Sequence, residues 1–534
     1  ALALAPAQSA AAVAAVCTAL AYSLLAGWGV PAQRTFLMLT VVAIALTRRR
    51  PASGATSLML AAVVVCLADP WAVIAPGFWL SFGAVAAIMW AMSGQMSLAA
   101  QLSVWRQRLR SAIRVQLAVS LALIPMTIAL FAQVSLVSPL ANAVAIPVVS
   151  WLVTPIALLA ALLSVLPEPL AQGAGPLLSV AHALFAWLVG VLQFLVQLPK
   201  AAVAWAVPPM WTLLCAMLGV AWLWAPRGWP LRAVGLVWLL PAIVWPAQRP
   251  AADELWVTAL DVGQGTAVIL QTQDATALYD TGARFSEQTD AGSRVIAPYF
   301  RYHGIDALDL LVVSHLDSDH SGGAVSVMAA VKTQQLLTSI DLSDAKHVAF
   351  ARGAQRSERC LAGQQGRLGA ARWQFLHPSA DDYEAASRLR RLSTNRLSCV
   401  MMLRFGRHRV LLAGDILKAQ EKQLLARSAV GALGPVTVLF APHHGSHSSS
   451  SLDWALATSP RWVAYTVGYH NRFGHPHEDI LERYAALGAQ TARTDFDGAI
   501  TWRLRANGGV SIVRARQVQR RYWHNVVPRL GVDT

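Results

Sequence analysis

Long apolar runs fill residues 1–250 of this chain, and they constrain its fold more than any other sequence feature. A helix needs about 20 apolar residues to span a membrane, where only helices and closed barrels satisfy their own backbone polar groups. Candidate spans lie near residues 10–28, 35–47, 57–75, 77–94, 116–133, 140–165, 175–197, 209–225 and 233–247. Because the second run is short and Pro147 and Pro155 interrupt the sixth, we expect eight or nine spans, one of them broken or re-entrant.

The alternative to a membrane domain is a large soluble helical core, which would need charged outer faces that these segments lack. Charged residues make up only 13% of the chain, about half the share of an average soluble protein. Residues 1–250 carry twelve basic and two acidic residues, a net charge of +10, which leaves +5 for residues 251–534. The chain therefore has two physically different parts, and most of its charge lies in membrane loops rather than along a path for nucleic acid.

The basic residues of the first part predict its orientation, since short cytoplasmic loops are rich in lysine and arginine. Arginines gather at 48–50, at 106–114 and at 227 and 232. If all three groups are cytoplasmic, the span at 233–247 carries residues 251 onward to the extracytoplasmic side. Residues 95–115 suit an amphipathic helix on the inner leaflet. The chain starts at Ala1 without a signal-peptide pattern, and we expect that it begins partway through a longer protein.

The five cysteines say little about function. Cys17, Cys66 and Cys215 lie in apolar segments and are interpreted as small core residues. Cys360 and Cys399 lie in the soluble part and can pair if it faces an oxidising compartment, although the sequence alone favours free thiols.

From residue 255 onward, short apolar strands alternate with helical stretches, a pattern that predicts α/β layers. Strands are expected at 255–272, 275–282, 308–315, 334–339, 407–415 and 436–446, and helices at 294–304 and 322–331. Several of these strands end in polar residues, which is where α/β folds place their sites.

The most informative cluster directly follows the strand expected at 308–315. His315, Asp317, Asp319 and His320 offer four potential ligands within six residues, and Gly322 and Gly323 allow a tight backbone turn beneath them. Imidazole and carboxylate groups bind divalent metals such as zinc and manganese. Further candidates end later strands or follow them: Asp415, His443, His444 and His475.

These motifs resemble known families. HLDSDHSGG at 315–323, AGD at 413–415 and PHHGS at 442–446 resemble the metallo-β-lactamase superfamily. VGQG at 262–265, DTG at 280–282 and GHP at 474–476 resemble more narrowly the ComEC competence proteins, as do the membrane segments 69–86 and 138–159. The resemblance implies a polytopic α-helical competence domain over 1–250, an α/β metallo-β-lactamase-type αββα sandwich over 251–515, and a C-terminal tail over 516–534. The family's usual first spans and small OB-like domain are absent, which agrees with a truncated start.

The resemblance also implies a ligand set for two divalent metal ions. It assigns His315, Asp317, Asp319 and His320 to the first ligand group, Asp415 to a bridging carboxylate and His443 to a later ligand. Asp317 replaces the superfamily's usual histidine, and a harder carboxylate favours manganese or magnesium over zinc. The superfamily expects a further histidine before Asp415. Asn395 and His377 are the candidates, and Asn395 fits slightly better because it precedes a strand.

Two bound metals activate water for attack on a phosphoryl group, so these residues predict metal-assisted hydrolysis. Asp319 is expected to bind metal and orient the nucleophile, and His475 or His444 to protonate the leaving oxygen or contact the phosphate. For His475, a supporting hydrogen bond is the alternative. Candidate contacts to DNA are Ser446, Ser448, Arg390 and Arg396. The serines are equally typical of helix-capping turns, and the arginines of a solvated face.

The resemblance implies a multi-pass protein of the bacterial inner membrane that takes up DNA during natural transformation. It implies double-stranded DNA arriving, a single strand crossing the membrane, and an extracytoplasmic nuclease domain that degrades the other strand. Implied partners are membrane lipid, a DNA receptor, a cytoplasmic motor and further copies of the chain. Two rival hypotheses remain: a transporter whose hydrolase-like domain only binds DNA, and a membrane-anchored hydrolase of another phosphodiester or ester.

Overall fold

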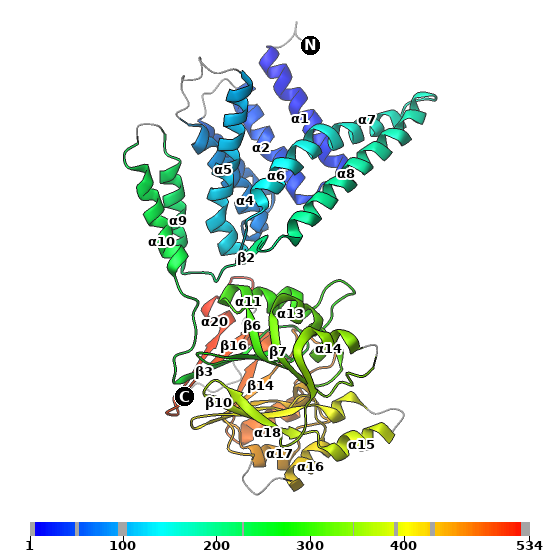
Figure 1. Cartoon of the computed structure of the whole chain (residues 1–534), viewed down its shortest axis with the longest axis vertical. Coiled ribbons are helices and arrows are strands. Elements are labelled where there is room, and N and C mark those ends of the chain that lie inside the picture. The colour runs from blue at the N-terminus through cyan, green and yellow to red at the C-terminus, as the bar shows by residue number, and fades with distance from the viewer. Residues whose placement is uncertain are drawn as a thin grey trace. The chain divides into compact units, whose positions relative to one another are not determined.

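The computed structural model describes residues 6–47, 53–93, 104–226, 229–344, 347–388, 393–427 and 433–524. The chain divides into two compact units, Ala1–Pro246 and Ala247–Thr534. The first unit is helical, and the second is built on two sheets with helices around them (Figure 1). This combination confirms the expected fold class of an α-helical domain followed by an α/β sandwich.

Apolar helices account for all nine runs of the first unit. Its described helices are α1 (Ala7–Leu25), α2 (Val30–Thr47), α3 (Gly54–Ala68), α4 (Pro76–Met92), α5 (Val104–Phe131), α6 (Ser138–Pro147), α7 (Thr154–Ser164), α8 (Ala174–Gln197), α9 (Met210–Leu223) and α10 (Gly235–Val244). Five stretches in the described part are long and apolar enough to cross a membrane: Ala7–Leu25, Val30–Thr47, Trp105–Phe131, Ser138–Ser164 and Leu170–Gln197. The other apolar helices are shorter, 10–17 residues each.

The sixth run stays helical through its two prolines. A π-helical turn at Val148–Val153 joins α6 to α7, so that the helical path is continuous over Ser138–Ser164. Proline removes a backbone donor from the helix, and widening the helix by one π turn accommodates this loss between Pro147 and Pro155. The run is therefore distorted rather than interrupted.

The expectation of a separate amphipathic helix over 95–115 is wrong for the part that the structure describes. Residues 104–115 continue directly into the next apolar run as the single helix α5. No glycine or proline lies between Arg114 and Leu117 to end a helix there, so the polar and apolar segments share one axis. Residues 94–103 lie outside the described part, as do Arg48–Arg50 and Arg227.

Two sheets form the centre of the second unit. The eight-stranded sheet has the order β17-β16-β3-β4-β5-β6-β7-β8, and the seven-stranded sheet has the order β15-β14-β13-β12-β11-β10-β9. Their bounds are β3 (Glu254–Ala259), β4 (Val268–Gln271), β5 (Thr276–Tyr279), β6 (Ala307–Val313), β7 (Lys332–Thr338), β8 (Ala354–Arg359), β9 (Gln365–Leu368), β10 (Ala371–His377), β11 (Val400–Phe405), β12 (His408–Leu412), β13 (Val438–Phe440), β14 (Trp462–Tyr465), β15 (Gln490–Arg493), β16 (Ile500–Arg505) and β17 (Val510–Arg514).

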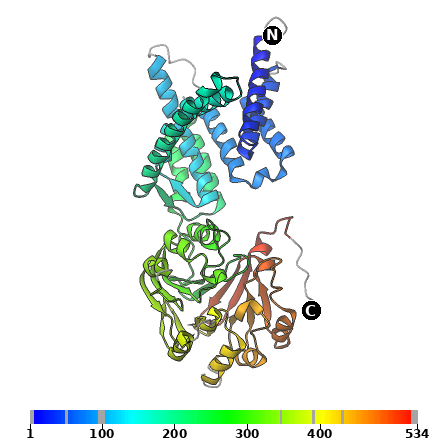
Figure 2. The same ribbon diagram turned by 90° about the vertical axis from the view of Figure 1, so that its right-hand side faces the viewer.

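The sheets pack face to face through an apolar core to which both contribute, for example Val257 and Leu270 from one sheet and Phe375 and Leu403 from the other. A second core joins the seven-stranded sheet to α16 (Lys418–Arg427), α17 (Leu452–Thr458) and α18 (Glu478–Ala486). A third joins the eight-stranded sheet to α11 (Ala297–His303) and α13 (Ala324–Ala330). The helices therefore cover the two outer faces of the sheets, as Figures 1 and 2 show, and the layers run αββα.

The parallel strands of each sheet direct their carboxyl ends to one edge. β5 pairs in parallel with β6, and β12, β13 and β14 pair in parallel with one another. Asp280 follows β5, His315 follows β6, and Asp415 follows β12. Polar side chains from both sheets can therefore meet at this edge.

A disulfide joins Cys360, directly after β8, to Cys399, directly before β11, with the Cα atoms 6.1 Å apart. The expectation of free thiols is therefore wrong for this pair. The two residues are 39 positions apart in sequence, and only the packing of one sheet on the other brings them together. Both are fully buried, so the bond links the two sheets inside the core.

Candidate metal centre

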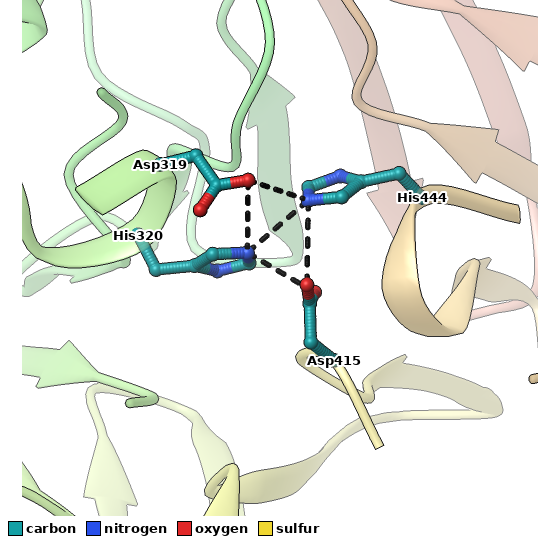
Figure 3. Close-up of side chains that lie close together, drawn as sticks. All are labelled: Asp319, His320, Asp415 and His444. Atoms are coloured by element: carbon teal, nitrogen blue, oxygen red, sulfur yellow. Dashed lines mark hydrogen bonds and ion pairs between the residues drawn. The ribbon is translucent and has the colours of Figure 1, made fainter. Parts of the chain in front are cut away.

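Four ligand-type side chains converge at the edge where the two sheets meet. The ligand atoms of Asp319, His320, Asp415 and His444 all lie within 4.8 Å of one another (Figure 3). His320 Nε2 is 3.0 Å from Asp415 Oδ1 and 3.2 Å from His444 Nε2. His444 Nε2 is 3.4 Å from Asp319 Oδ2. Three of the four are buried, while the Asp319 side chain is 30% exposed and faces the solvent side of the group.

Local backbone geometry brings these residues together. His320 lies in the short helix α12 (Ser318–Ser321), and His444 lies in the turn Pro442–Gly445 after β13. His443 and His444 both have positive φ angles, 50° and 57°, a conformation that costs roughly 1–2 kcal/mol for each non-glycine residue. Such strain is typical of functional sites, and here it places two successive imidazoles close to Asp415.

The VGQG motif lets the backbone approach the site closely. Gly265 has a φ of +131°, and a Cβ atom there would lie 2.3 Å from the backbone oxygen of Asp319. The Thr266 N–H donates to that same oxygen at 3.1 Å. Glycine at 265 therefore allows the loop to hold the Asp319 backbone in place.

Asp280 orients His320 from behind. Asp280 Oδ2 lies 2.7 Å from His320 Nδ1, and the carboxylate also accepts the backbone N–H of Ser314 at 2.6 Å and its hydroxyl at 2.8 Å. A carboxylate on one ring nitrogen leaves the other nitrogen directed at the metal position. The structure thus places Asp280 as the hydrogen-bond partner of the candidate ligand His320.

The group holds strongly perturbed charges. Burial alone would raise the pKa of Asp415, but the imidazoles of His320 and His444 outweigh it and hold that pKa well below its ordinary value. The pKa of Asp319 is also lowered, because burial, which would raise it, is outweighed by the imidazoles of His444 and His320. Burial lowers the pKa of His320, but Asp415 and Asp280 overcome it and raise the pKa well above its ordinary value. The carboxylates therefore stay ionised and attract positive charge to this point.

A second group lies beside the first. The Nε2 atom of His315 is buried without a hydrogen-bond partner and lies 3.7 Å from Asp317 Oδ2. The His315 ring is 4.3 Å from the His320 ring, and Thr394 donates a hydrogen bond to Asp317. A buried ring nitrogen without a hydrogen-bond partner that lies next to the group of four is available to bind a metal ion. The donor atoms of the group of four therefore fit a divalent metal ion, and His315 and Asp317 offer further donors beside it.

The structure distinguishes His377 from Asn395, the two candidates for the position where the superfamily has a further histidine before Asp415. His377 Nδ1 lies 2.9 Å from the backbone oxygen of Ser398, and its Nε2 lies 3.5 Å from Asp382. Both of its nitrogens thus face groups outside the cluster. Asn395 is buried in the short turn Thr394–Leu397, and its Oδ1 lies 3.4 Å from the Thr394 hydroxyl, which contacts Asp317.

The structure places His444, rather than His443, among the four converging ligands. His443 Nε2 is 3.7 Å from Asp415 Oδ2, its Nδ1 is 2.8 Å from the Ser448 hydroxyl, and its side chain is 26% exposed. His444 is almost fully buried, and its Nδ1 lies 3.3 Å from Thr466 Oγ1. The adjacent imidazoles therefore take different positions, with His444 inside the group of four candidate ligands and His443 at its rim.

His475 and the serines line the neighbourhood of the cluster. The His475 ring is 6.4 Å from the His444 ring and 5.8 Å from the His443 ring. Burial, followed by the nearby His444 and His443, lowers the pKa of His475 to about 4. Ser446 is buried and contacts Ser448 at 3.0 Å, whereas Ser448 is exposed beside His443. Ser448 is therefore the serine that a ligand can reach.

The structure adds no support for the two arginines that the sequence suggests as DNA contacts. Arg396 is exposed, and Arg390 lies outside the described residues. Three hydroxyl residues that sequence reasoning missed contact the ligand groups: Ser314, Thr394 and Thr466. Only Ser314 carries a sequence signal, since it directly precedes His315; the other two reach the site through folding alone.

Comparisons with known proteins agree with this architecture. Residues 1–230 match the Competence protein family, and residues 260–369 match the Metallo-beta-lactamase superfamily. Competence protein ComA of Neisseria gonorrhoeae is 35% identical over 95% of this chain and 66% of its own length. Uncharacterized protein YcaI of Escherichia coli (strain K12) is 29% identical over 95% of this chain and 64% of its own length. Recombination protein 2 of Haemophilus influenzae is 27% identical over 90% of this chain and 62% of its own length.

The chain spans 62–66% of the lengths of these three relatives. Among solved structures, the metallo-beta-lactamase fold protein YhfI from Bacillus subtilis aligns with 48% of this chain and 100% of its own at 12% identity, with a TM-score of 0.31. At that score the likeness adds nothing to the family assignment. The two family matches and the similarity to ComA carry that assignment: the chain joins a Competence protein domain to a metallo-beta-lactamase superfamily domain.

Proposed function

We propose that this chain takes up DNA through the membrane, and that its second unit hydrolyses phosphodiester bonds of the strand that is not imported. The observation that carries the proposal is the convergence of Asp319, His320, Asp415 and His444 in a chain that also has a Competence domain. Membrane passage is supported by the five long apolar helical stretches. The hydrolase is supported by the metallo-beta-lactamase match and the ligand group.

We assign the metal-binding roles by position. Asp319, His320, Asp415 and His444 hold one divalent ion, manganese or zinc. His315, Asp317 and the shared Asp415 hold a second, with Asn395 beside them. Two such ions supply Lewis acidity and lower the pKa of bound water.

The remaining roles follow from exposure and charge. The Asp319 carboxylate is the only partly exposed member of the four, so it accepts a hydrogen bond from the attacking water and orients it. His475 has a pKa of about 4 and is therefore a neutral imidazole at pH 7. A neutral ring carries one N–H, which His475 donates to a phosphate oxygen, and the Ser448 hydroxyl is placed to do the same.

We propose that the second unit is extracytoplasmic. The arginine-rich loops of the first part favour this orientation by the positive-inside rule. The disulfide between Cys360 and Cys399 gives independent support, because disulfides persist in oxidising compartments. Because both cysteines are buried, thiol alkylation of the chain after denaturation under acid quench of the cells tests this. We expect Cys360 and Cys399 to be modified only after reduction; modification of both without reductant would contradict the assignment.

A second candidate function has one observation in its favour. An amide at Asn395 is a weaker metal ligand than imidazole, which favours a domain that binds DNA without cutting it. In that case incoming double-stranded DNA, the transported single strand, a DNA receptor and a cytoplasmic motor remain the expected partners, beside membrane lipid and further copies of the chain.

A cleavage assay separates the two candidates. The full chain in lipid nanodiscs is incubated with labelled DNA and either manganese or zinc, beside the double variant Asp319→Ala/His320→Ala. We expect metal-dependent cleavage by the native chain and loss of at least a thousandfold in the variant. No cleavage with either metal, or equal cleavage by the variant, would refute the nuclease and leave the binding function.

A further inference from the structure

The loop at residues 468–477 presents aromatic side chains next to the metal centre. Tyr469 is 50% exposed and Phe473 is 47% exposed, whereas the largest aromatic side chains of the core, such as Trp454 and Trp502, are fully buried. Half-exposed aromatic rings are costly to leave in water and are typical of recognition surfaces.

Phe473 connects to the metal centre through a series of nearly parallel rings. The Phe473 and His475 rings are 5.7 Å apart with an interplanar angle of 22°. The His475 and His444 rings follow at 6.4 Å and 23°. Because His444 belongs to the ligand group, Phe473 lies two ring spacings from the metal position.

Hydrogen bonds brace the loop, so Phe473 is held in place rather than carried on a free segment. The Asn471 side chain donates to the backbone oxygens of His475 at 2.6 Å and Gly468 at 3.1 Å, and accepts the His475 N–H at 3.0 Å. The His477 N–H donates to the backbone oxygen of Gly445, beside His444. The loop and the ligand turn are therefore one pre-organised structure.

Charge around Phe473 favours an anionic polymer at this face. The exposed Arg472 guanidinium lies over the Phe473 ring, 4.8 Å from its centre. Two acids, Glu478 and Asp479, directly follow the loop, and Asp479 is paired with His447 at 2.9 Å and Arg483 at 3.6 Å. A cation over part of the ring face can hold the phosphate of a nucleotide whose base lies on the exposed part of the ring.

We propose that Phe473, with Arg472 and Tyr469, forms a stacking platform for an unpaired nucleobase and thereby makes single-stranded DNA the preferred substrate of the metal centre. This inference rests on the proposed function and deepens it. Bases inside a duplex are already stacked on their neighbours and cannot lie on a protein ring, whereas each base of a single strand offers a free face. A base on Phe473 sets the phosphodiester one or two nucleotides along the strand at the ligand group.

Binding of two matched oligonucleotides to the full chain in nanodiscs tests the platform. One is a labelled oligothymidine and the other an abasic strand of equal length and charge, both measured by fluorescence anisotropy with EDTA present to prevent hydrolysis. We expect the oligothymidine to bind about tenfold more tightly, since stacking contributes about 1–3 kcal/mol per base. Phe473→Leu removes this preference without weakening abasic binding, and Phe473→Trp restores it.

Tyr302→Leu is the control, because Tyr302 is an exposed aromatic of α11 outside the ring series. Equal affinity of the native chain for both strands, or an equal loss of both in Phe473→Leu, would overturn the platform. The cleavage assay is read separately. Base preference without cleavage refutes the nuclease and leaves the platform, whereas cleavage without base preference refutes the platform and leaves the nuclease.

Discussion

The two units of this chain differ in how many acidic residues they carry and in whether they bury them. Residues 1–250 carry only two acidic residues, and their apolar side chains are widely exposed, as suits contact with lipid. The second unit buries Asp280, His320 and Asp415 at one edge of its sheets. Burying charge is costly unless it is paired or binds metal, so a cluster of buried acidic and imidazole groups favours a chemical site at this edge. The contrast supports the proposed division, in which the first unit serves passage and the second unit serves chemistry.

The largest effect is expected from removing Asp415, the carboxylate that we propose both ligand groups share. Asp415→Asn keeps the shape of the side chain but removes its charge from between His320 and His444. We expect metal-dependent hydrolysis to fall at least a thousandfold, measured by initial rates of cleavage. Asp341→Asn, at an exposed aspartate, is the control and should keep its rate. A loss of less than tenfold in Asp415→Asn would contradict the assigned ligand.

The converse change tests the first unit. Trp151 lies in the π-helical turn and is 79% exposed, so Trp151→Asp places a charge on an apolar face at a cost of about 2.5–3.5 kcal/mol. We expect transformation frequency in a naturally transformable host to fall about a hundredfold while hydrolysis by the purified chain is unchanged. Trp151→Leu should retain uptake. Joint loss of uptake and hydrolysis in Trp151→Asp would mean that the two units do not act separately.

A smaller effect, on metal affinity, is expected from a change at Asp280, the hydrogen-bond partner of His320. Asp280→Asn weakens the hydrogen bond that orients His320, and loss of such a partner typically costs 10–100-fold in metal affinity. Titration of the full chain with manganese, followed by metal analysis, measures the change. Asp309→Asn, at an aspartate of β6 away from the ligands, is a suitable control. Unchanged metal affinity in Asp280→Asn would remove Asp280 from the site.

The smallest predicted effect is a pH dependence of the free energy of unfolding, caused by a residue away from the metal centre. Burial, helped by Arg249, lowers the pKa of His303 from 6.5 to about 4. Between these values the unfolded chain binds a proton that the folded chain does not. The free energy of unfolding therefore decreases as pH falls from about 6.5 toward 4, by roughly 1–2 kcal/mol. Urea unfolding at pH 7.5 and pH 5 should show a smaller decrease for His303→Gln; an equal decrease would exclude His303 as the cause.

The sequence predicts the local parts of this site well because they depend on adjacent residues. Four ligand-type residues directly after β6 come together through one turn, and the strand before them reads clearly as apolar. The choice between His443 and His444 is different. It depends on two positive φ angles, which cannot be predicted from the residue type of either histidine. The disulfide likewise depends on the stacking of two sheets, which no local pattern of residues records.

Metal stoichiometry of the full chain tests the central claim most directly. The chain is dialysed against manganese or, in a parallel sample, zinc, and the bound metal per chain is counted by mass spectrometry beside Asp319→Ala/His320→Ala. We expect two ions per native chain and at most one in the variant, because His315 and Asp317 keep their own group. A native chain that binds no manganese and no zinc would contradict the metal centre, and with it the proposed hydrolysis.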